Sequence, residues 1–234
     1  DPLDVITGVQ FDVALDFQLA WPFPFEWRRF YSTGRVHEHL PLGWGHTHSY
    51  DHRLTFDVNG LLYTDPSGGR HGFAFPPTDG ASSAGSTGVL RRVTASAFVV
   101  KVRAQPSCEF TFSDPARPAR LQSVSRGRSR QQLLYDRNGT WIELAYRDEP
   151  RVRVVTDGSG HVASLIWLEA DRARDITLWR AEYDDEGNLI AVADVYRTTQ
   201  SFEYDAGYRM TGRKHRRGYG FVVSYDGSGR CDRS

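Results

Sequence analysis

The sequence predicts an all-β fold built from repeated, stacked β-hairpins. A Tyr-Asp pair recurs down the second half of the chain, usually with a glycine three residues after the aspartate. Successive copies begin 21, 27, 21 and 21 residues apart. A fixed period of this size is typical of repeat architectures, in which each unit is one supersecondary element. Helical periodicity is weak: a stripe over residues 164–178 fits a helix or a strand equally well.

Each copy has an aspartate that opens a turn and, directly before it, a tyrosine or a threonine. They are Tyr135-Asp136-Arg137-Asn138-Gly139, Thr156-Asp157-Gly158-Ser159-Gly160, Tyr183-Asp184-Asp185-Glu186-Gly187, Tyr204-Asp205, and Tyr225-Asp226 with Gly229. Two earlier stretches look like relaxed copies: Phe56-Asp57-Val58-Asn59-Gly60 and Tyr63-Thr64-Asp65-Pro66-Ser67-Gly68. The repeat is therefore expected to begin before Tyr135.

The spacing from aspartate to glycine has a physical explanation. Aspartate favours the first position of a type I turn, where its carboxylate accepts hydrogen bonds from the turn's own amides, and glycine readily takes the positive φ that follows. A type I turn with a glycine bulge is a common hairpin connection. The tyrosines end the incoming strands, and we expect their rings to stack from one repeat to the next as a ladder. One hairpin is unstable alone, so several are expected to join in a twisted, curling sheet.

Three segments follow one another along the chain. Residues 1–75 form a strand-rich N-terminal module, residues 76–120 a loop-rich connection with short strands, and residues 121–234 the hairpin repeats. In the module, apolar and polar residues alternate over Phe11–Leu19, which predicts a half-buried strand. Further strands are predicted at 26–31, 49–56, 97–102 and 109–112, and an exposed, mobile loop of small residues at 76–88.

Composition excludes several classes of protein. The chain is 39% hydrophobic and 25% charged, so it can bury a core, and 29 basic residues balance 29 acidic ones. Nothing in this balance points to nucleic acid. No apolar run approaches the roughly 20 residues that span a bilayer. Cys108 and Cys231 could form a disulfide, but free buried thiols are more typical of two such distant cysteines. The opening Asp1-Pro2 suggests a processed piece or an excerpt of a longer protein.

A cluster of histidines supplies the main chemical alternative. His37, His39, His46, His48 and His52 lie close together in the sequence, with Asp51 beside them. If these stretches are extended, pairs two residues apart share one strand face, and imidazole with carboxylate suits zinc. The other interpretation is that these histidines are structural or exposed.

Other motifs favour no enzyme class. The basic run Arg213-Lys214-His215-Arg216-Arg217 and the arginines at 126, 128 and 130 could contact nucleic acid, but solvated or inward-facing charge fits a neutral chain better. The sequence contains no nucleophile elbow and no P-loop. Six tryptophans and repeated Asp-rich turns would also suit a glycan-binding β-protein.

The N-terminal motifs, together with the repeats, resemble Rhs (YD-repeat) proteins. Asp1-Pro2-Leu3-Asp4-Val5-Ile6-Thr7-Gly8 is similar to the opening of the domain that precedes the Rhs repeats, and Trp27, Arg29 and Tyr31 to its Trp-x-Arg-x-Tyr. Gly43, Trp44, His48, Tyr50 and Asp51 resemble a third block, with the order of Trp and Gly altered. The resemblance covers roughly residues 1–75 and 133–234 and leaves the middle unassigned.

The resemblance implies a non-enzymatic part of a β-shell, a cocoon or barrel-like cage around a toxin domain at the C-terminus of the same polypeptide. Such packages are made in the bacterial cytoplasm and are secreted or injected into competitors, often by type VI machinery with PAAR and VgrG tip proteins. No cofactor is expected. The family's self-cleavage signature, Asp-Pro-x-Gly-Leu, is absent here; Asp65-Pro66-Ser67-Gly68-Gly69 lacks its context. About five clear repeats cannot close a cage alone.

Two alternatives remain open at this stage. One is a secreted or surface β-rich module that binds glycan or protein. The other is a metal-dependent enzyme that uses the histidine cluster.

Overall fold

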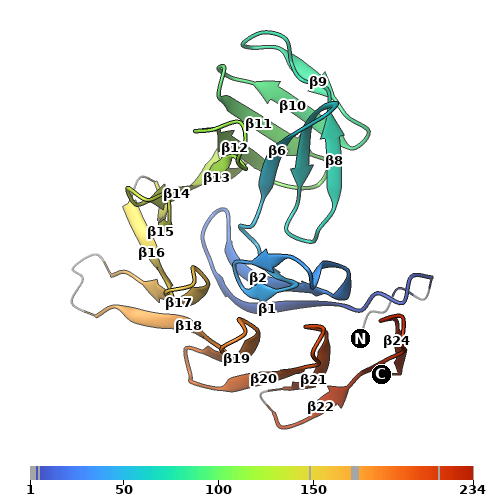
Figure 1. The fold of residues 1–234 in the computed structure, drawn as a ribbon. Helices are drawn as coiled ribbons and strands as arrows, with labels where there is room; N and C mark the ends of the chain where they lie inside the picture. The colour runs from blue at the N-terminus through green and yellow to red at the C-terminus, as the bar shows by residue number, and fades with distance from the viewer. Residues whose placement is uncertain (1–3, 5, 148, 170–173, 216, 234) are drawn as a thin grey trace. The chain divides into compact units, whose positions relative to one another are not determined.

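The computed structural model describes residues 4, 6–147, 149–169, 174–215 and 217–233. Within these residues the chain forms twenty-four strands and one short 3₁₀ helix, Thr33–Arg35, and no α-helix (Figure 1). The predicted all-β fold is confirmed, and the ambiguous stretch 164–178 belongs to two strands and their connection. Asp1 and Pro2, which the N-terminal motif includes, lie outside the described residues.

The strands are short and follow one another closely. The first twelve are β1 (Phe11–Leu19), β2 (Phe25–Ser32), β3 (His39–Leu40), β4 (Gly43–Trp44), β5 (His46–His48), β6 (Arg53–Asp57), β7 (Gly60–Thr64), β8 (Arg70–Phe73), β9 (Ser82–Ala84), β10 (Gly88–Arg92), β11 (Ala97–Val102) and β12 (Ser107–Thr111). The others are β13 (Arg120–Arg126), β14 (Ser129–Tyr135), β15 (Trp141–Tyr146), β16 (Glu149–Thr156), β17 (Val162–Trp167), β18 (Ile176–Tyr183), β19 (Leu189–Asp194), β20 (Thr199–Tyr204), β21 (Met210–Lys214), β22 (Gly220–Val222), β23 (Ser224–Tyr225) and β24 (Cys231–Arg233).

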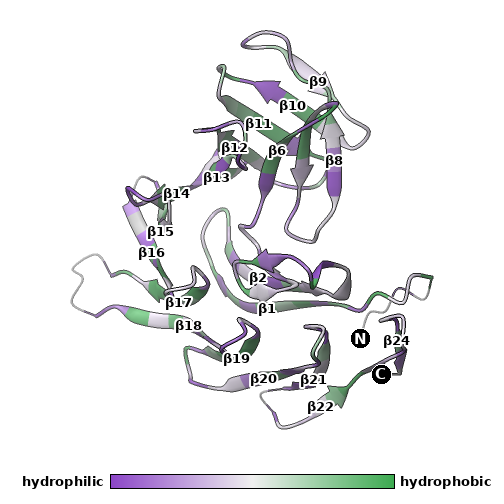
Figure 2. Cartoon of the chain, in the orientation of Figure 1, coloured by the Kyte–Doolittle hydropathy of each residue, from purple (hydrophilic) through white to green (hydrophobic). Residues whose placement is uncertain are grey.

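Fourteen strands, β9 to β22, form one sheet in which each strand pairs with its neighbour along the chain. This order needs only hairpin connections, which is the arrangement that stacked hairpin repeats predict. Two three-stranded sheets, β1-β2-β5 and β6-β7-β8, and two strand pairs, β3-β4 and β23-β24, complete the described part. Hydrophilic and hydrophobic residues are interleaved along these strands (Figure 2).

The chain divides into two compact units. The first contains residues 1–19, 26–49 and 152–234, and the second contains residues 20–25 and 50–151. Each unit is assembled from stretches that are not contiguous in the sequence. The three predicted segments therefore describe the order of motifs along the sequence and not the compact units.

The second unit shows where the loop prediction for residues 76–88 was wrong. Ser82–Ala84 forms β9, which pairs with β10 through Val89 opposite Ala84. Such a strand carries no hydrophobic signal, because backbone pairing and not burial holds it at the sheet edge. The core of this unit is formed by fully buried side chains: Leu54, Leu90, Phe98 and Phe110.

The second unit also holds the Cys108 thiol. Cys108 lies on β12, is free and buried, and has its sulfur 3.9 Å from the Tyr63 hydroxyl. Burial raises the pKa of the Cys108 thiol to about 12. The thiol therefore stays protonated and unreactive near neutral pH.

The first unit contains a strand that turns its polar side inward. Asp12 and Asp16 on β1 have buried side chains, whereas Phe11, Val13 and Leu15 are exposed. The period of two residues is as predicted, but hydrophobicity alone would have put the other face inside. Charged partners from β2 and β21 compensate the two buried carboxylates.

Candidate functional site: the N-terminal segment docked on the YD turns

Five turns of one type define the repeats. We call them the YD turns, after the aspartate that opens each: Asp136, Asp157, Asp184, Asp205 and Asp226. In the third, Oδ1 of Asp184 accepts hydrogen bonds from the amides of Glu186 at 3.1 Å and Asn188 at 2.8 Å. The other four aspartates accept the same two bonds.

The residue three positions after each aspartate has a positive φ. Gly139, Gly160, Gly187 and Gly229 have φ between 81° and 89°. In the fourth turn the position holds Tyr208, with φ 61°. Backbone bonds close every turn, for example from Gly187 N to Asp184 O at 3.1 Å. These are the bonds and dihedrals that a type I turn with a bulge requires.

The two relaxed copies turn out differently. Asp65 accepts from Ser67 N at 2.9 Å and Gly69 N at 3.0 Å, so it opens a turn of the same type. Asp57 does not open such a turn. It ends β6 and pairs with Gly60, the first residue of β7, across a tight hairpin. The Asp57 prediction was wrong because the strand ladder continues through the aspartate. A turn that the sequence did not reveal begins at Asp194, which is followed by no glycine.

The repeat tyrosines join neighbouring hairpins through their hydroxyl groups. Tyr183 donates to Val162 O at 2.8 Å, and Tyr204 donates to Leu189 O at 2.8 Å. Tyr135 makes the same bond to Leu121 O, and Tyr225 to Met210 O, each at 2.6 Å. The bonds of Tyr135, Tyr183 and Tyr204 cross from the end of one strand to the beginning of the preceding strand, and the bond of Tyr225 crosses from β23 to β21.

The expected stacking of tyrosine on tyrosine is absent among the described repeats. Successive tyrosines are two strands apart, about 9–10 Å at the usual strand spacing, whereas ring pairs need about 4.5–7 Å between centroids. Other rings fill the gap instead: His161 stacks on Tyr183 at 4.5 Å. The hydroxyl bond replaces the ring contact that we predicted.

Burial and hydrogen bonds shift the pKa values of several repeat residues. Burial raises the pKa of Tyr204 well above its ordinary value, so the hydroxyl stays a donor at any physiological pH. Although burial opposes it, hydrogen bonds from the His161 amide and ring lower the pKa of Asp157. In the same way, bonds from Arg209 outweigh burial and lower the pKa of Asp205.

The N-terminal segment, residues 6–19 and 26–49, packs against these turns within the first unit. Trp44 donates from Nε1 to Glu186 O at 2.8 Å and stacks on Tyr208 with centroids 4.7 Å apart. One indole therefore contacts two successive YD turns. The preceding Gly43 has φ 88°, and a Cβ atom there would lie 2.4 Å from Gly187 O.

Other residues of the segment reach further strands and turns. Val162 N donates to Pro41 O at 2.9 Å, and Met210 N donates to the Tyr31 hydroxyl at 2.6 Å. Cys231 N donates to Gly8 O at 3.1 Å, beside the last YD turn. Gly8 has φ 72°, and a Cβ atom there would meet the Arg230 side chain at 2.7 Å. Thr7 is exposed and accepts a hydrogen bond from Val9 N.

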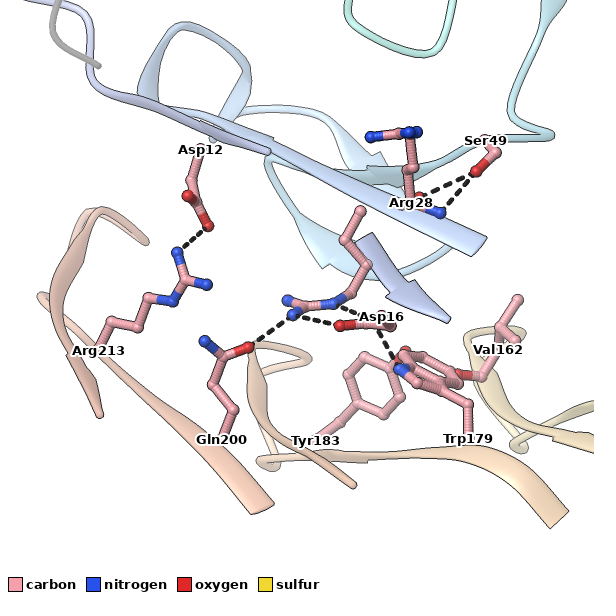
Figure 3. Close-up of polar contacts among 10 residues, drawn as sticks. Asp12, Asp16, Arg28, Ser49, Val162, Trp179, Tyr183, Gln200 and Arg213 are labelled. Atoms are coloured by element: carbon pink, nitrogen blue, oxygen red, sulfur yellow. Dashed lines mark hydrogen bonds and ion pairs between the residues drawn. The ribbon is translucent and has the colours of Figure 1, made fainter. Parts of the chain in front are cut away.

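A buried ion pair lies at the centre of this contact (Figure 3). Arg29 binds Asp16 through two nitrogen–oxygen contacts of 2.6 and 3.1 Å, and both side chains are 2% exposed. Gln200 accepts from Arg29 at 2.8 Å, and Trp179 donates to Asp16 at 2.8 Å. A second pair joins Arg213 to Asp12 at 2.7 Å. The carboxylate of Asp16 is thus neutralised by Arg29 of the same segment, and that of Asp12 by Arg213 of the repeats.

Two tryptophans pack against each other beside the ion pair, and one of them, Trp179, is bonded to Asp16. Trp27 is fully buried, stacks on His48 at 4.6 Å and meets the edge of Trp179 at 5.4 Å. Although burial alone would lower it, the charge of Asp16 raises the pKa of Arg29. Arg29 therefore stays charged.

The structure separates the five histidines of the predicted cluster. His46 lies 2.8 Å from the Tyr204 hydroxyl, His48 stacks on Trp27, and His37 is exposed. His39 places its Nε2 2.8 Å from Nε2 of His161. His52 bonds to Tyr63 at 2.7 Å in the second unit. No group of three or more His, Cys, Asp or Glu side chains in the described ranges could hold a metal ion.

The remaining motif residues lie in the second unit. Tyr50 donates to Gln131 Oε1 at 2.7 Å and stacks on Phe25 at 5.5 Å. Asp51 forms an ion pair with Arg53 at 2.9 Å. The first YD turn, at Asp136, belongs to this unit as well.

Several residues of the site escaped the sequence analysis: Asp12, Asp16, His161, Trp179 and Gln200. The two aspartates lie four residues apart on a predicted strand, so they share one face, and that spacing could have marked them. His161, Trp179 and Gln200 carry no local signal. Of the basic run, Arg213 pairs with Asp12, and Arg216 lies outside the described residues.

Comparison with known proteins gives one family match. A family described as Domain of unknown function (DUF6531) matches residues 1–73. A search of curated proteins found no match. Among solved structures, 27 chains match. One, from the "Crystal Structure of TcdB2-TccC3-Cdc42", matches over 92% of this chain with 12% identity and a TM-score of 0.38.

This chain spans 12% of the length of that solved chain. A likeness at this low TM-score supports no statement about function. No helix in the described part of the chain is long and apolar enough to cross a membrane. The DUF6531 match, residues 1–73, contains the N-terminal motifs and the whole docked segment.

Proposed function

We propose that this chain is a structural segment of an Rhs-type shell, whose wall encloses a toxin domain of the same polypeptide and carries it during secretion. The contact between the N-terminal segment and successive YD turns supports this most directly. Through Trp44, Tyr31 and Gly8 the segment meets several hairpins at once. A segment that ties several hairpins together would help a container wall to hold its shape.

The way the hairpins are joined supports a wall as well. Each hairpin adds to the next by strand pairing and by one tyrosine hydroxyl bond, so further copies can extend the sheet without a new kind of contact. We include a toxin cargo, a type VI secretion route and PAAR and VgrG partners in the proposal because the N-terminal motifs resemble those of Rhs proteins. In this role the chain acts by enclosure and needs no catalytic group.

Protection of a downstream domain tests the proposal. The full polypeptide that contains this chain is treated with protease, and the C-terminal domain is followed on gels and by its toxicity to the producing cell. We expect the domain to be protected and to co-purify with the shell. Trp44→Ala, which removes the contacts to Glu186 and Tyr208, should expose it.

Tyr196→Ala is the matched control, because Tyr196 is 86% exposed on the repeats. A downstream domain that is as sensitive to protease in the wild-type polypeptide as it is when isolated would refute enclosure. Retention of the chain on a glycan array would favour a binding module instead. Stoichiometric zinc that is lost in His46→Ala and His48→Ala would favour the metal-dependent enzyme.

A further inference from the structure

His46 is a buried neutral histidine at the contact between the N-terminal segment and the repeats. Its side chain is 1% exposed, and its Nε2 lies 2.8 Å from the Tyr204 hydroxyl. That hydroxyl has one hydrogen, which it donates to Leu189 O at 2.8 Å. The His46 Nε2–H must therefore donate to the hydroxyl oxygen, which leaves the lone pair on Nδ1.

Nδ1 of His46 is buried and has no hydrogen-bond partner among the described residues. A proton added there would find no acceptor. The surroundings oppose a charge as well: two cations, Arg29 of β2 and Arg213 of β21, act on His46, and the nearest rings are Tyr31 at 4.6 Å and Phe202 at 6.0 Å. The carboxylates of Asp16 and Asp12 are already bound to the two arginines. Burial, and then these arginines, lower the pKa of His46 well below its ordinary value.

A second pair of imidazoles joins the same two parts of the unit. His161 contacts the Asp157 carboxylate through Nδ1 at 3.1 Å, so Nδ1 donates and Nε2 accepts. His39 must then donate its Nε2–H across the 2.8 Å contact. His39 also meets Trp44, and Tyr183 stacks on His161. The contact therefore needs a free lone pair on Nε2 of His161.

We propose that the docking of the N-terminal segment on the YD turns is an acid-released latch, with His46 as the group whose protonation opens it. Opening gives His46 water as a hydrogen-bond acceptor and separates it from Arg213 of the repeats, whereas Arg29 stays with His46 because both lie in the N-terminal segment. The latch is a property of contacts inside this chain, so it goes beyond the shell function and does not depend on what the wall encloses.

The sign and the pH range follow from proton counting. The docked state holds His46 neutral, whereas the open state binds a proton below the ordinary histidine pKa of about 6.5. The opening constant therefore rises as pH falls, by up to about tenfold per pH unit for one histidine. The range is about pH 6.5 to 4.5, because aspartates titrate mainly below about pH 4.

Hydrogen exchange tests the latch on the whole chain. Protection factors of peptides from residues 26–48 are measured between about pH 7 and pH 5 in the wild type, in His46→Gln and in His37→Gln. We expect the opening constant of the wild type to rise about tenfold or more. The glutamine at position 46 keeps a donor for Tyr204 but cannot be protonated, so its rise should be about threefold or less.

His37→Gln is the matched control, because it removes an exposed histidine from the same segment and should behave as the wild type. A rise in His46→Gln as large as in the wild type, or no rise in the wild type, overturns the proposal. If His46→Gln does not fold, NMR titration of the wild-type histidines decides. Titration of His46 near pH 6.5 while residues 26–48 stay protected also overturns it.

Discussion

Gly43 shows how one residue permits contact between the N-terminal segment and a YD turn. Its φ is 88°, and a Cβ atom would lie 2.4 Å from the carbonyl oxygen of Gly187. Two separate costs therefore exclude other residues: the left-handed backbone and the clash. Gly160 has a similar φ, 89°, but no atom within 4 Å of a Cβ position, so it separates the two costs.

Gly43→Ala should destabilise the first unit more than Gly160→Ala does. The backbone term is about 1–2 kcal/mol for both variants. The backbone clash at Gly43 should bring its total to about 3 kcal/mol or more. Urea unfolding measures both free energies, and equal losses would show that the turn moves away from position 43 at little cost.

At the scale of hairpins, the tyrosine hydroxyl bonds explain why the repeats need tyrosine and not phenylalanine. The hydroxyl of Tyr183 satisfies the carbonyl of Val162 on the neighbouring strand. The 27-residue interval before Tyr183 does not disturb this bond, because the connection between β17 and β18 (168–175) is longer than the one between β19 and β20 (195–198). The repeats therefore differ in length in the connections at the strand ends opposite the YD turns.

Tyr183→Phe should destabilise the first unit by about 1–3 kcal/mol, because it leaves a buried carbonyl without its donor. Tyr196→Phe is the control, since Tyr196 is 86% exposed and its hydroxyl should contribute little. The measurement is the midpoint and slope of urea unfolding for each variant. An equal stability of the two variants would contradict the role given to the hydroxyl bond.

The YD turn carboxylates should produce an acid limb in the stability profile. Although burial opposes it, hydrogen bonds lower the pKa values of Asp157 and Asp205 below the ordinary value of 3.8. A lowered folded-state pKa stabilises above 3.8, and this stabilisation is lost as pH falls through the folded value. Each carboxylate steepens the limb by at most about 1.4 kcal/mol per pH unit.

The double variant Asp157→Asn and Asp205→Asn should flatten this limb below about pH 4, because the asparagine oxygen accepts the same amide bonds without titrating. Asp185→Asn is the control: Asp185 lies in a YD turn but is exposed. Unfolding free energies between about pH 5 and pH 2 decide. An unchanged acid limb in the double variant would contradict the prediction.

At the scale of the first compact unit, a buried ion pair couples distant parts of the chain. Arg29 and Asp16 come from the N-terminal segment, and Gln200 and Trp179 from the repeats complete their hydrogen bonds. A buried pair of this kind is weak evidence for net stability, but it is specific, because each group is costly without its partner. It therefore selects one register of the segment on the repeats.

Arg29→Met should destabilise the first unit by about 3–5 kcal/mol, since it leaves Asp16 buried without its cation. The neighbouring Arg28→Met should cost at most about 1 kcal/mol, because the Arg28–Glu26 pair is 39% and 37% exposed. Asp16→Asn combined with Arg29→Met should recover part of the loss. An Arg29→Met loss as small as that of Arg28→Met would show that the pair is not buried in solution.

The sequence by itself determined the all-β fold and most of the turns. Asp-x-x-Gly specifies its hairpin locally, because four consecutive residues contain both the amide acceptor and the positive φ, so Asp184 to Gly187 could be read without any tertiary partner. The same local logic failed at Asp57 and missed Asp194, since neighbouring strand pairing decides where a ladder ends.

Only the tertiary structure decided which face of β1 is buried, what the repeat tyrosines bind and which histidines are buried. Asp16 is tolerated inside because Arg29 and Trp179 meet it, and Trp179 lies 163 positions further along the chain. Burial, and then the charges of Arg29 and of a repeat residue, Arg213, lower the pKa of His46 and hold it neutral. Such properties depend on partners distant in sequence, because desolvation and charge act through space and leave no periodic trace in the chain.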